Sequence, residues 1–134
     1  MFKLVLIAFL SYVTIDVGHA AYYDHGVMEQ VVRIRQAGWT ASPLPEELPN
    51  VLGFVAVKDC DRIGQMVALW HGSEGWTFPY LVSDCANKLE KHDLELERKG
   101  IVVEVDFNTA ARWQVLGLGP EFIDVIVVSK FRGY

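Results

Sequence analysis

Both cysteines of this chain lie in copies of one four-residue string, Val-x-Asp-Cys, at residues 57–60 and 82–85. With no third cysteine present, the simplest arrangement is one disulfide between Cys60 and Cys85. It would close a loop of about 25 residues and stabilise the fold by roughly 3.5 kcal/mol. Two free thiols are the alternative. A zinc site is disfavoured because no other Cys or His stands at ligand spacing, and we expect no metal or cofactor.

The N-terminal segment has the pattern of a secretory signal peptide. Lys3 supplies a positive charge, an apolar run follows from Leu4 to Val13, and Gly18-His19-Ala20 places small residues where a signal peptidase cuts. A membrane anchor would need about 20 apolar residues, and Asp16 interrupts the run too early. We therefore predict a signal peptide over residues 1–20, cleavage before Ala21, and a secreted or periplasmic protein without a stable membrane anchor.

Residues 21–134 then form one domain, which we expect to be a monomer. The chain has 12 basic and 17 acidic residues, a formal net charge of −5, and no basic run. This balance argues against nucleic acid and anionic membrane surfaces as partners. Residues 86–100 are highly charged, which is typical of a solvated loop or an exposed helix.

The rest of the sequence predicts short strands and two brief helices. A first helix is expected from Asp24 to about Gln36, because Val27, Val31 and Ile34 recur at helical spacing and Gly38 suits its end. Short apolar runs predict strands near residues 52–57, 66–70, 77–83, 101–107 and 123–128, with a proline-rich connector over 41–50 and a helix over 109–115 capped by Asn108. No helix follows each strand, so a small closed barrel is favoured over a parallel α/β sheet.

Four segments carry a family resemblance: Ala21-Tyr22-Tyr23, Leu52 to Val57, Tyr80 to Asp84, and Val103 to Ala111. In this order they resemble the double-psi β-barrel domain of rare lipoprotein A-like lytic transglycosylases and, more loosely, expansins and barwin-like proteins. The resemblance implies a mainly β, small six-stranded double-psi β-barrel that binds or cuts cell-wall polysaccharide such as peptidoglycan. It also implies that Asp84 stands at the family's catalytic aspartate. The family's neighbouring histidine has no counterpart here, which favours binding over cleavage.

The two aspartates of the repeated string form a second argument for a site. If both segments are extended and joined by the disulfide, Asp59 and Asp84 share a face, with carboxylates very roughly 5–10 Å apart. Glycosidases use pairs of carboxyl groups at such separations, one as acid and one as base or nucleophile. The alternative is that Asp59 caps the turn at the end of its strand.

Aromatic residues could provide a stacking surface for sugar rings. Trp76, which follows a glycine in a turn, is expected to be exposed. The other candidate contacts are Tyr22, Tyr23, Trp70, Phe78 and Tyr80. Trp39, Trp70 and Trp113 are expected to pack in the core. His71 could shuttle a proton, although a solvated loop histidine has the same sequence pattern.

Three functions are consistent with these features. The first is a secreted barrel that binds polysaccharide without cutting it. The second is a lytic transglycosylase-type enzyme with Asp84 as acid/base. The third is a protein–protein module, such as an inhibitor, that uses the charged 86–100 segment or the C-terminal tail.

Overall fold

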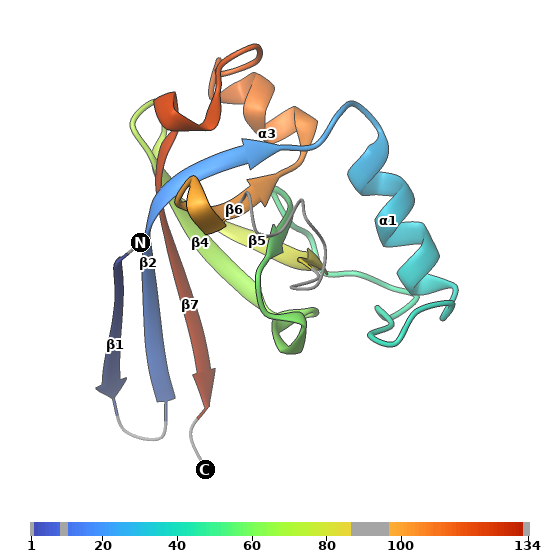
Figure 1. Cartoon of the computed structure of the whole chain (residues 1–134). Coiled ribbons are helices and arrows are strands. Elements are labelled where there is room, and N and C mark those ends of the chain that lie inside the picture. Colours follow the sequence, from blue (N-terminus) through green and yellow to red (C-terminus); the bar gives the residue numbers. More distant parts are fainter. Residues whose placement is uncertain (1, 9–10, 87–96, 133–134) are drawn as a thin grey trace.

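A closed β-barrel forms the centre of the computed structural model, which describes residues 2–8, 11–86 and 97–132 (Figure 1). The elements are β1 (Phe2–Ala8), β2 (Ser11–Tyr22), α1 (Val27–Gln36), β3 (Gly53–Val57), η1 (Cys60–Arg62), β4 (Met66–His71), β5 (Gly75–Cys85), β6 (Ile101–Val105), α3 (Phe107–Arg112), η2 (Pro120–Phe122) and β7 (Asp124–Arg132). The predicted mainly β barrel with short helices is confirmed.

Six of the strands form the closed ring in the order β2-β6-β3-β5-β4-β7, and β7 pairs back with β2. The β2–β6 and β3–β5 pairs are parallel, while the other pairs are antiparallel. β1 pairs with β2 outside the ring, and Figure 1 shows β1, β2 and β7 reaching together beyond the barrel. The sheet is therefore mixed, with α1 placed to one side of it.

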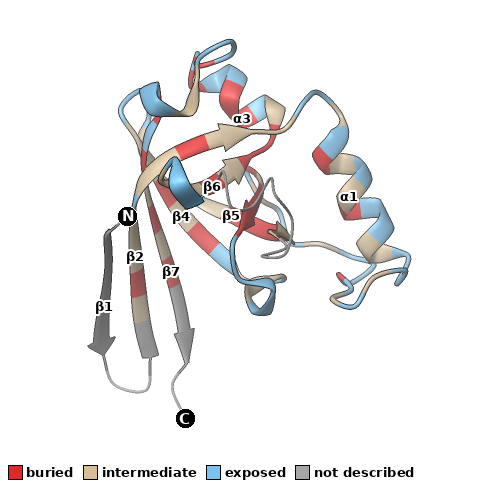
Figure 2. Ribbon diagram, viewed as in Figure 1, coloured by how far each residue is buried: buried red, intermediate tan, exposed pale blue. Residues whose placement is uncertain are grey.

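Side chains that alternate along the strands fill the barrel. Figure 2 marks the buried positions in red along the strands. The buried set comprises Ala20, Val55, Val57, Val67, Leu69, Tyr80, Val82, Val103, Val105, Ala110, Trp113, Val115, Ile123, Val125 and Val127. Trp113, just after α3, is 2% exposed, so its predicted core position is confirmed. Asp106 begins α3 by accepting a hydrogen bond from the Thr109 amide through its carboxylate, so the prediction of Asn108 as the cap was wrong.

The predicted first helix is present, and the residues whose spacing predicted it are not the ones it buries. Val27 and Ile34 are 40% and 41% exposed, whereas Met28 and Val32 are buried. The helix rests on the outside of β5, where Val32 joins Leu44 and Leu81 in a second small apolar cluster. Val27 and Ile34, on the adjacent side of the helix, therefore remain largely exposed to solvent.

Trp39 also differs from its predicted core position, because it is 80% exposed. The chain leaves α1 through Gly38, whose φ of 78° lies in the left-handed region that glycine tolerates. This turn carries Trp39 away from the barrel. Most of the charged segment over 86–100, namely residues 87–96, lies outside the described residues.

β2 includes the end of the predicted signal peptide. Residues 11–19 pair with β7, and residues 19–22 pair with β6. Thr14 and Ala20 are buried, at 1% and 0% exposed. Cleavage before Ala21 stays a prediction. In the described part of the chain, no helix has the length and apolar character needed to cross a membrane.

Candidate functional site

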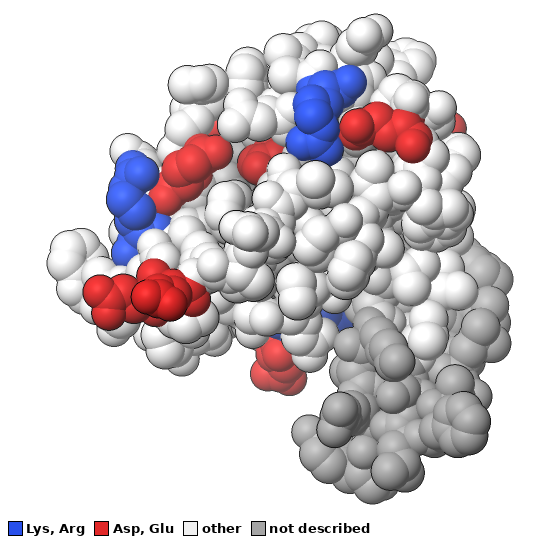
Figure 3. Space-filling view, turned by 180° about the vertical axis from the view of Figure 1, so that it is seen from behind, with Lys and Arg blue, Asp and Glu red and all other residues white. Residues whose placement is uncertain are grey.

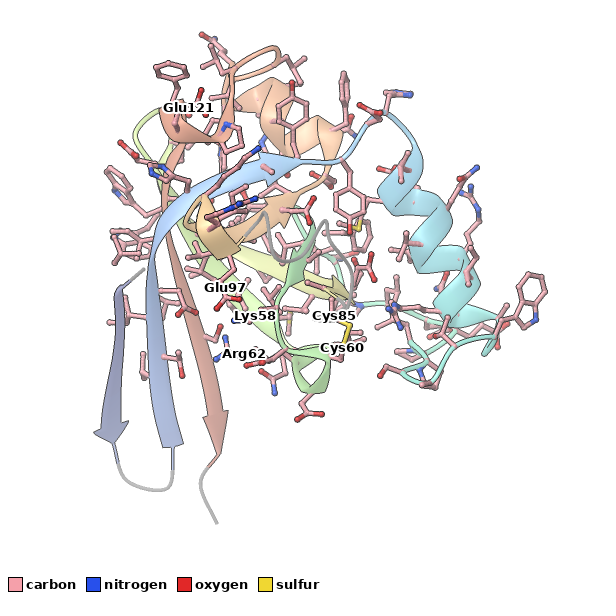
Figure 4. All side chains as sticks on the ribbon, in the orientation of Figure 1. Lys58, Cys60, Arg62, Cys85, Glu97 and Glu121 are labelled. Atoms are coloured by element: carbon pink, nitrogen blue, oxygen red, sulfur yellow. A yellow bond between two sulfur atoms is a disulfide. The ribbon has the colours of Figure 1, made fainter. Side chains whose placement is uncertain are left out.

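The disulfide between Cys60 and Cys85 is confirmed, with the two Cα atoms 4.9 Å apart. It joins the start of η1 to the last residue of β5, next to the parallel pairing of Val57 with Cys85. Figure 4 places it at the opposite end of the barrel from Glu121. The bond therefore fixes the point at which β5 leaves the sheet, directly after Asp84.

Asp84 is held by two side chains from distant parts of the sequence. The Tyr23 hydroxyl donates a hydrogen bond of 2.7 Å to Oδ2 of Asp84. Arg35 Nη2, from α1, forms an ion pair of 2.8 Å with Oδ1. The Asp84 side chain keeps 19% of its surface exposed. The carboxylate thus sits between the end of β2 and α1, fixed in orientation and still reached by solvent.

A second carboxylate, that of Glu104, lies in the same region of the sheet. Ala56 of β3 pairs with Asp84 on one side and with Glu104 of β6 on the other. Two strand spacings separate the two acidic residues at the backbone by about 10 Å. Burial raises the pKa of Tyr23, and the hydrogen bond to Asp84 and the charges of Asp84 and Glu104 raise it further. The Tyr23 hydroxyl therefore stays protonated and keeps its donor role.

Asp59 occupies a different setting from Asp84. It is an exposed residue in extended conformation directly before η1. Its side chain makes no capping hydrogen bond, while its backbone carbonyl accepts one from the Arg62 amide. The two side chains that hold Asp84 are therefore Tyr23 and Arg35, and Asp59 takes no part in that arrangement.

Exposed aromatic residues form a separate surface on the outside of the barrel. Trp76 pairs with Trp70, Trp70 with Ile126, and Ile126 with Val17, which gives one row across four strands. Directly opposed residues of antiparallel strands project from the same side of the sheet. Phe78 lies two residues from Trp76 along β5 and therefore on the same side.

We call Val17, Trp70, Trp76, Phe78 and Ile126 the aromatic face. Trp76, Phe78 and Val17 are 55%, 60% and 40% exposed, while Trp70 and Ile126 are half-buried. The expected exposure of Trp76 is confirmed, and Trp70 is only partly in the core. No member of this face carries a charge. Its β5 residues lie about 20 to 26 Å along the strand from Asp84, so the aromatic face and Asp84 are two separate regions.

Tyr80 and His71 have mainly structural contacts. Tyr80 is fully buried, and its hydroxyl bonds to Arg112 Nη2 at 2.7 Å and to Thr77 at 2.9 Å. The His71 ring stacks on Trp113 with centroids 4.5 Å apart. Burial lowers the pKa of His71, although the charges of Glu74 and Asp124 act in the opposite direction.

Two residues of these regions, Arg35 and Glu104, were not predicted from the sequence. Arg35 was overlooked because 49 positions separate it from Asp84. Glu104 alternates with buried Val103 and Val105, a pattern that marks it as outward-facing but does not name its neighbours. Phe78, one of the candidate stacking residues, is 60% exposed.

Charged side chains are spread over the surface of the molecule. Viewed from behind, acidic and basic side chains form small separate groups rather than one continuous area of either sign (Figure 3). The described residues contain no group of three or more His, Cys, Asp or Glu side chains able to hold a metal ion.

No protein-family model matches the chain, and no curated protein matches it either.

Proposed function

We propose that this protein is a secreted barrel that retains β2, including Val17, and binds an uncharged region of a cell-wall polysaccharide through its aromatic face. The observation that carries the proposal is the row of Trp76, Trp70, Ile126 and Val17, extended by Phe78. Sugar rings have apolar faces that stack on aromatic rings, and indole offers the largest such surface. An uncharged face in a chain of net charge −5 suits a ligand without charge better than an acidic polymer.

Two further features are in keeping with this proposal. The closed six-stranded mixed sheet is compatible with the double-psi β-barrel resemblance, which we retain as part of the proposal. The Cys60–Cys85 disulfide is in keeping with export, because disulfides persist mainly in oxidising compartments.

Binding to insoluble peptidoglycan and cellulose, measured by co-sedimentation, tests the proposal. Trp76→Ala and Phe78→Ala should each weaken binding by about fivefold, since each removes one stacked ring worth about 1 kcal/mol. Trp39→Ala is the matched control, because Trp39 is more exposed yet lies outside the aromatic face. Equal binding by Trp76→Ala and Trp39→Ala, or no binding by the wild type, would refute the proposal.

A second candidate is glycan cleavage at Asp84. The observation in its favour is that Asp84 and Glu104 flank Ala56 and both act on the Tyr23 hydroxyl. Two carboxyl groups across a sugar can serve as acid and base, and a lytic transglycosylase needs one such group. Mass analysis of peptidoglycan digests tests it: anhydro-sugar products that disappear in Asp84→Asn would favour cleavage, and wild-type digests without products would exclude it.

A further inference from the structure

Arg35 connects three parts of the molecule through its guanidinium group. Nη2 reaches Asp84 on β5, while Nη1 donates to Thr40 Oγ1 at 3.2 Å and to the Ser42 carbonyl at 3.1 Å. The Arg35 side chain is only 11% exposed. Breaking its bond to Asp84 would leave the bonds to Thr40 and Ser42 in place, so Arg35 would move with α1 and the connector.

Backbone and side-chain hydrogen bonds make α1 and residues 40–46 one unit. The Leu44 amide donates to the Arg35 carbonyl, and Gln36 Nε2 donates to the carbonyls of Pro45 and Glu46. We call α1 with residues 40–46 the α1 unit. The helix is bracketed by Gly26 and Gly38, both in the left-handed conformation, and it has no side-chain cap at its start. These two glycines are natural pivots for the helix.

The α1 unit contacts the barrel through three buried apolar side chains and one ion pair. Of the helix side chains, only Met28 and Val32 are buried, and the Met28 sulfur accepts a hydrogen bond from Ser83. Val27 and Ile34 remain substantially exposed. Leu44, in the same unit, is also buried with Val32 against Leu81, and the Arg35–Asp84 ion pair adds one charged contact to this small apolar packing.

We propose that the Arg35–Asp84 ion pair is a latch that holds the α1 unit against β5, and that a ligand with hydroxyl groups opens it by taking the hydrogen bonds of Asp84. The first half depends only on the contacts of Arg35. The second half rests on the proposed polysaccharide function and requires the glycan to reach Asp84. The latch would make access to Asp84 conditional on movement of α1.

Amide hydrogen exchange of the full chain tests the latch without any ligand. Arg35→Gln and Asp84→Asn should each speed exchange of the α1 amides by about tenfold, and the double variant should add nothing, since both remove the same contact. Arg35→Lys should restore part of the protection. Arg33→Gln is a matched control on the same helix, because Arg33 is exposed. Tyr23→Phe removes the other partner of Asp84 and should leave α1 protected.

Two results would overturn the latch. In the first, α1 exchanges equally in Arg35→Gln and Arg33→Gln, so the ion pair does not hold the helix. In the second, Tyr23→Phe opens α1 as much as Arg35→Gln does, which would mean that the whole region loosens together. Exchange in the barrel strands, measured in the same experiment, distinguishes opening of α1 from global destabilisation.

The proposed opening of the Arg35–Asp84 contact by a ligand is tested by adding a soluble chito-oligosaccharide of about six rings to the wild type. The expected result is faster exchange in α1, with no further change in Arg35→Gln. Binding that leaves α1 exchange unchanged overturns opening by ligand but leaves the proposed function standing. Absence of any binding, to this probe and to insoluble glycan, refutes the function while the variant results still decide the latch.

Discussion

The two ends of β5 differ in cover, charge and cross-links. At its C-terminal end, Asp84 is bonded to Tyr23 and Arg35, lies beside α1, and adjoins a disulfide. At its N-terminal end, Trp76 and Phe78 project uncharged rings into solvent. One strand thus presents a covered polar group and an open apolar surface.

Under the proposed function, the two ends of β5 would perform different tasks. A flat, uncharged surface can hold a polymer without rearrangement, because stacking needs only an exposed ring. A carboxylate that is already bonded must exchange those partners before it can act on a ligand. The aromatic face is therefore suited to binding, and the Asp84 end to a step that follows binding.

The largest expected effect comes from removing the strand on which both ends depend. A chain beginning at Ala21 lacks most of β2, which closes the barrel by pairing with β7 and β6. We expect a loss of more than about 5 kcal/mol, enough to abolish cooperative unfolding of a typical domain. A chain beginning at Ser11, which lacks only β1, should still unfold cooperatively.

Calorimetry of these two truncated chains tests whether β2 is needed for cooperative unfolding. The N-terminal sequence of the exported protein shows whether β2 is retained. An exported protein that starts at Ala21 and melts cooperatively would show that the ring of strands is not needed in the mature form. The two ends of β5 would then belong to an open sheet rather than to a closed barrel.

Removing the disulfide should affect one end of β5 far more than the other. Cys60→Ser with Cys85→Ser should lower the free energy of unfolding by about 3.5 kcal/mol, because the reduced unfolded chain gains conformational freedom. Binding to insoluble glycan through the aromatic face should persist below the new melting temperature. Loss of that binding in a folded double variant would show that the two ends are coupled.

A matched pair of tyrosine variants compares the two ends directly. Tyr80→Phe removes a buried hydroxyl that bonds to Arg112 and Thr77, and should cost about 1–2 kcal/mol. Tyr23→Phe removes one hydrogen bond at a site that solvent can reach, and should cost about 1 kcal/mol or less. Urea unfolding measures both, and a larger cost for Tyr23→Phe would place the more rigid network at the Asp84 end.

The sequence was sufficient for β3 to β7 because apolar alternation is local, but it did not predict β1 and β2, whose apolar run also fits a signal peptide. It was insufficient for the face of α1, since two apolar sectors lie side by side on this helix. Val27, Val31 and Ile34 form one, and Met28 and Val32 form the other. Which sector is buried depends on where β5 passes beneath the helix, and that is decided by tertiary packing.

The candidate site was predictable only in part for a similar reason. Cys60 and Cys85 could be paired because no other cysteine competes, and Trp76 could be placed outside because it follows a turn. The contact of Arg35 with Asp84 and the row through Trp70, Ile126 and Val17 require the register of strands far apart in the sequence. Register of this kind emerges only when the ring of strands closes.

The smallest expected effect concerns His71, at the end of β4 near the aromatic face. Its lowered pKa means that the fold favours the neutral ring. As pH falls through the ordinary histidine value near 6.5, the unfolded chain takes up a proton more readily than the folded chain, so stability is lost. Above that value the contribution of His71 is complete. His71→Phe keeps a flat ring on Trp113 but cannot titrate. Its melting temperature should therefore fall less than that of the wild type between about pH 7.5 and about pH 5.5, and equal falls in the two proteins would show that His71 titrates alike in the folded and unfolded chains.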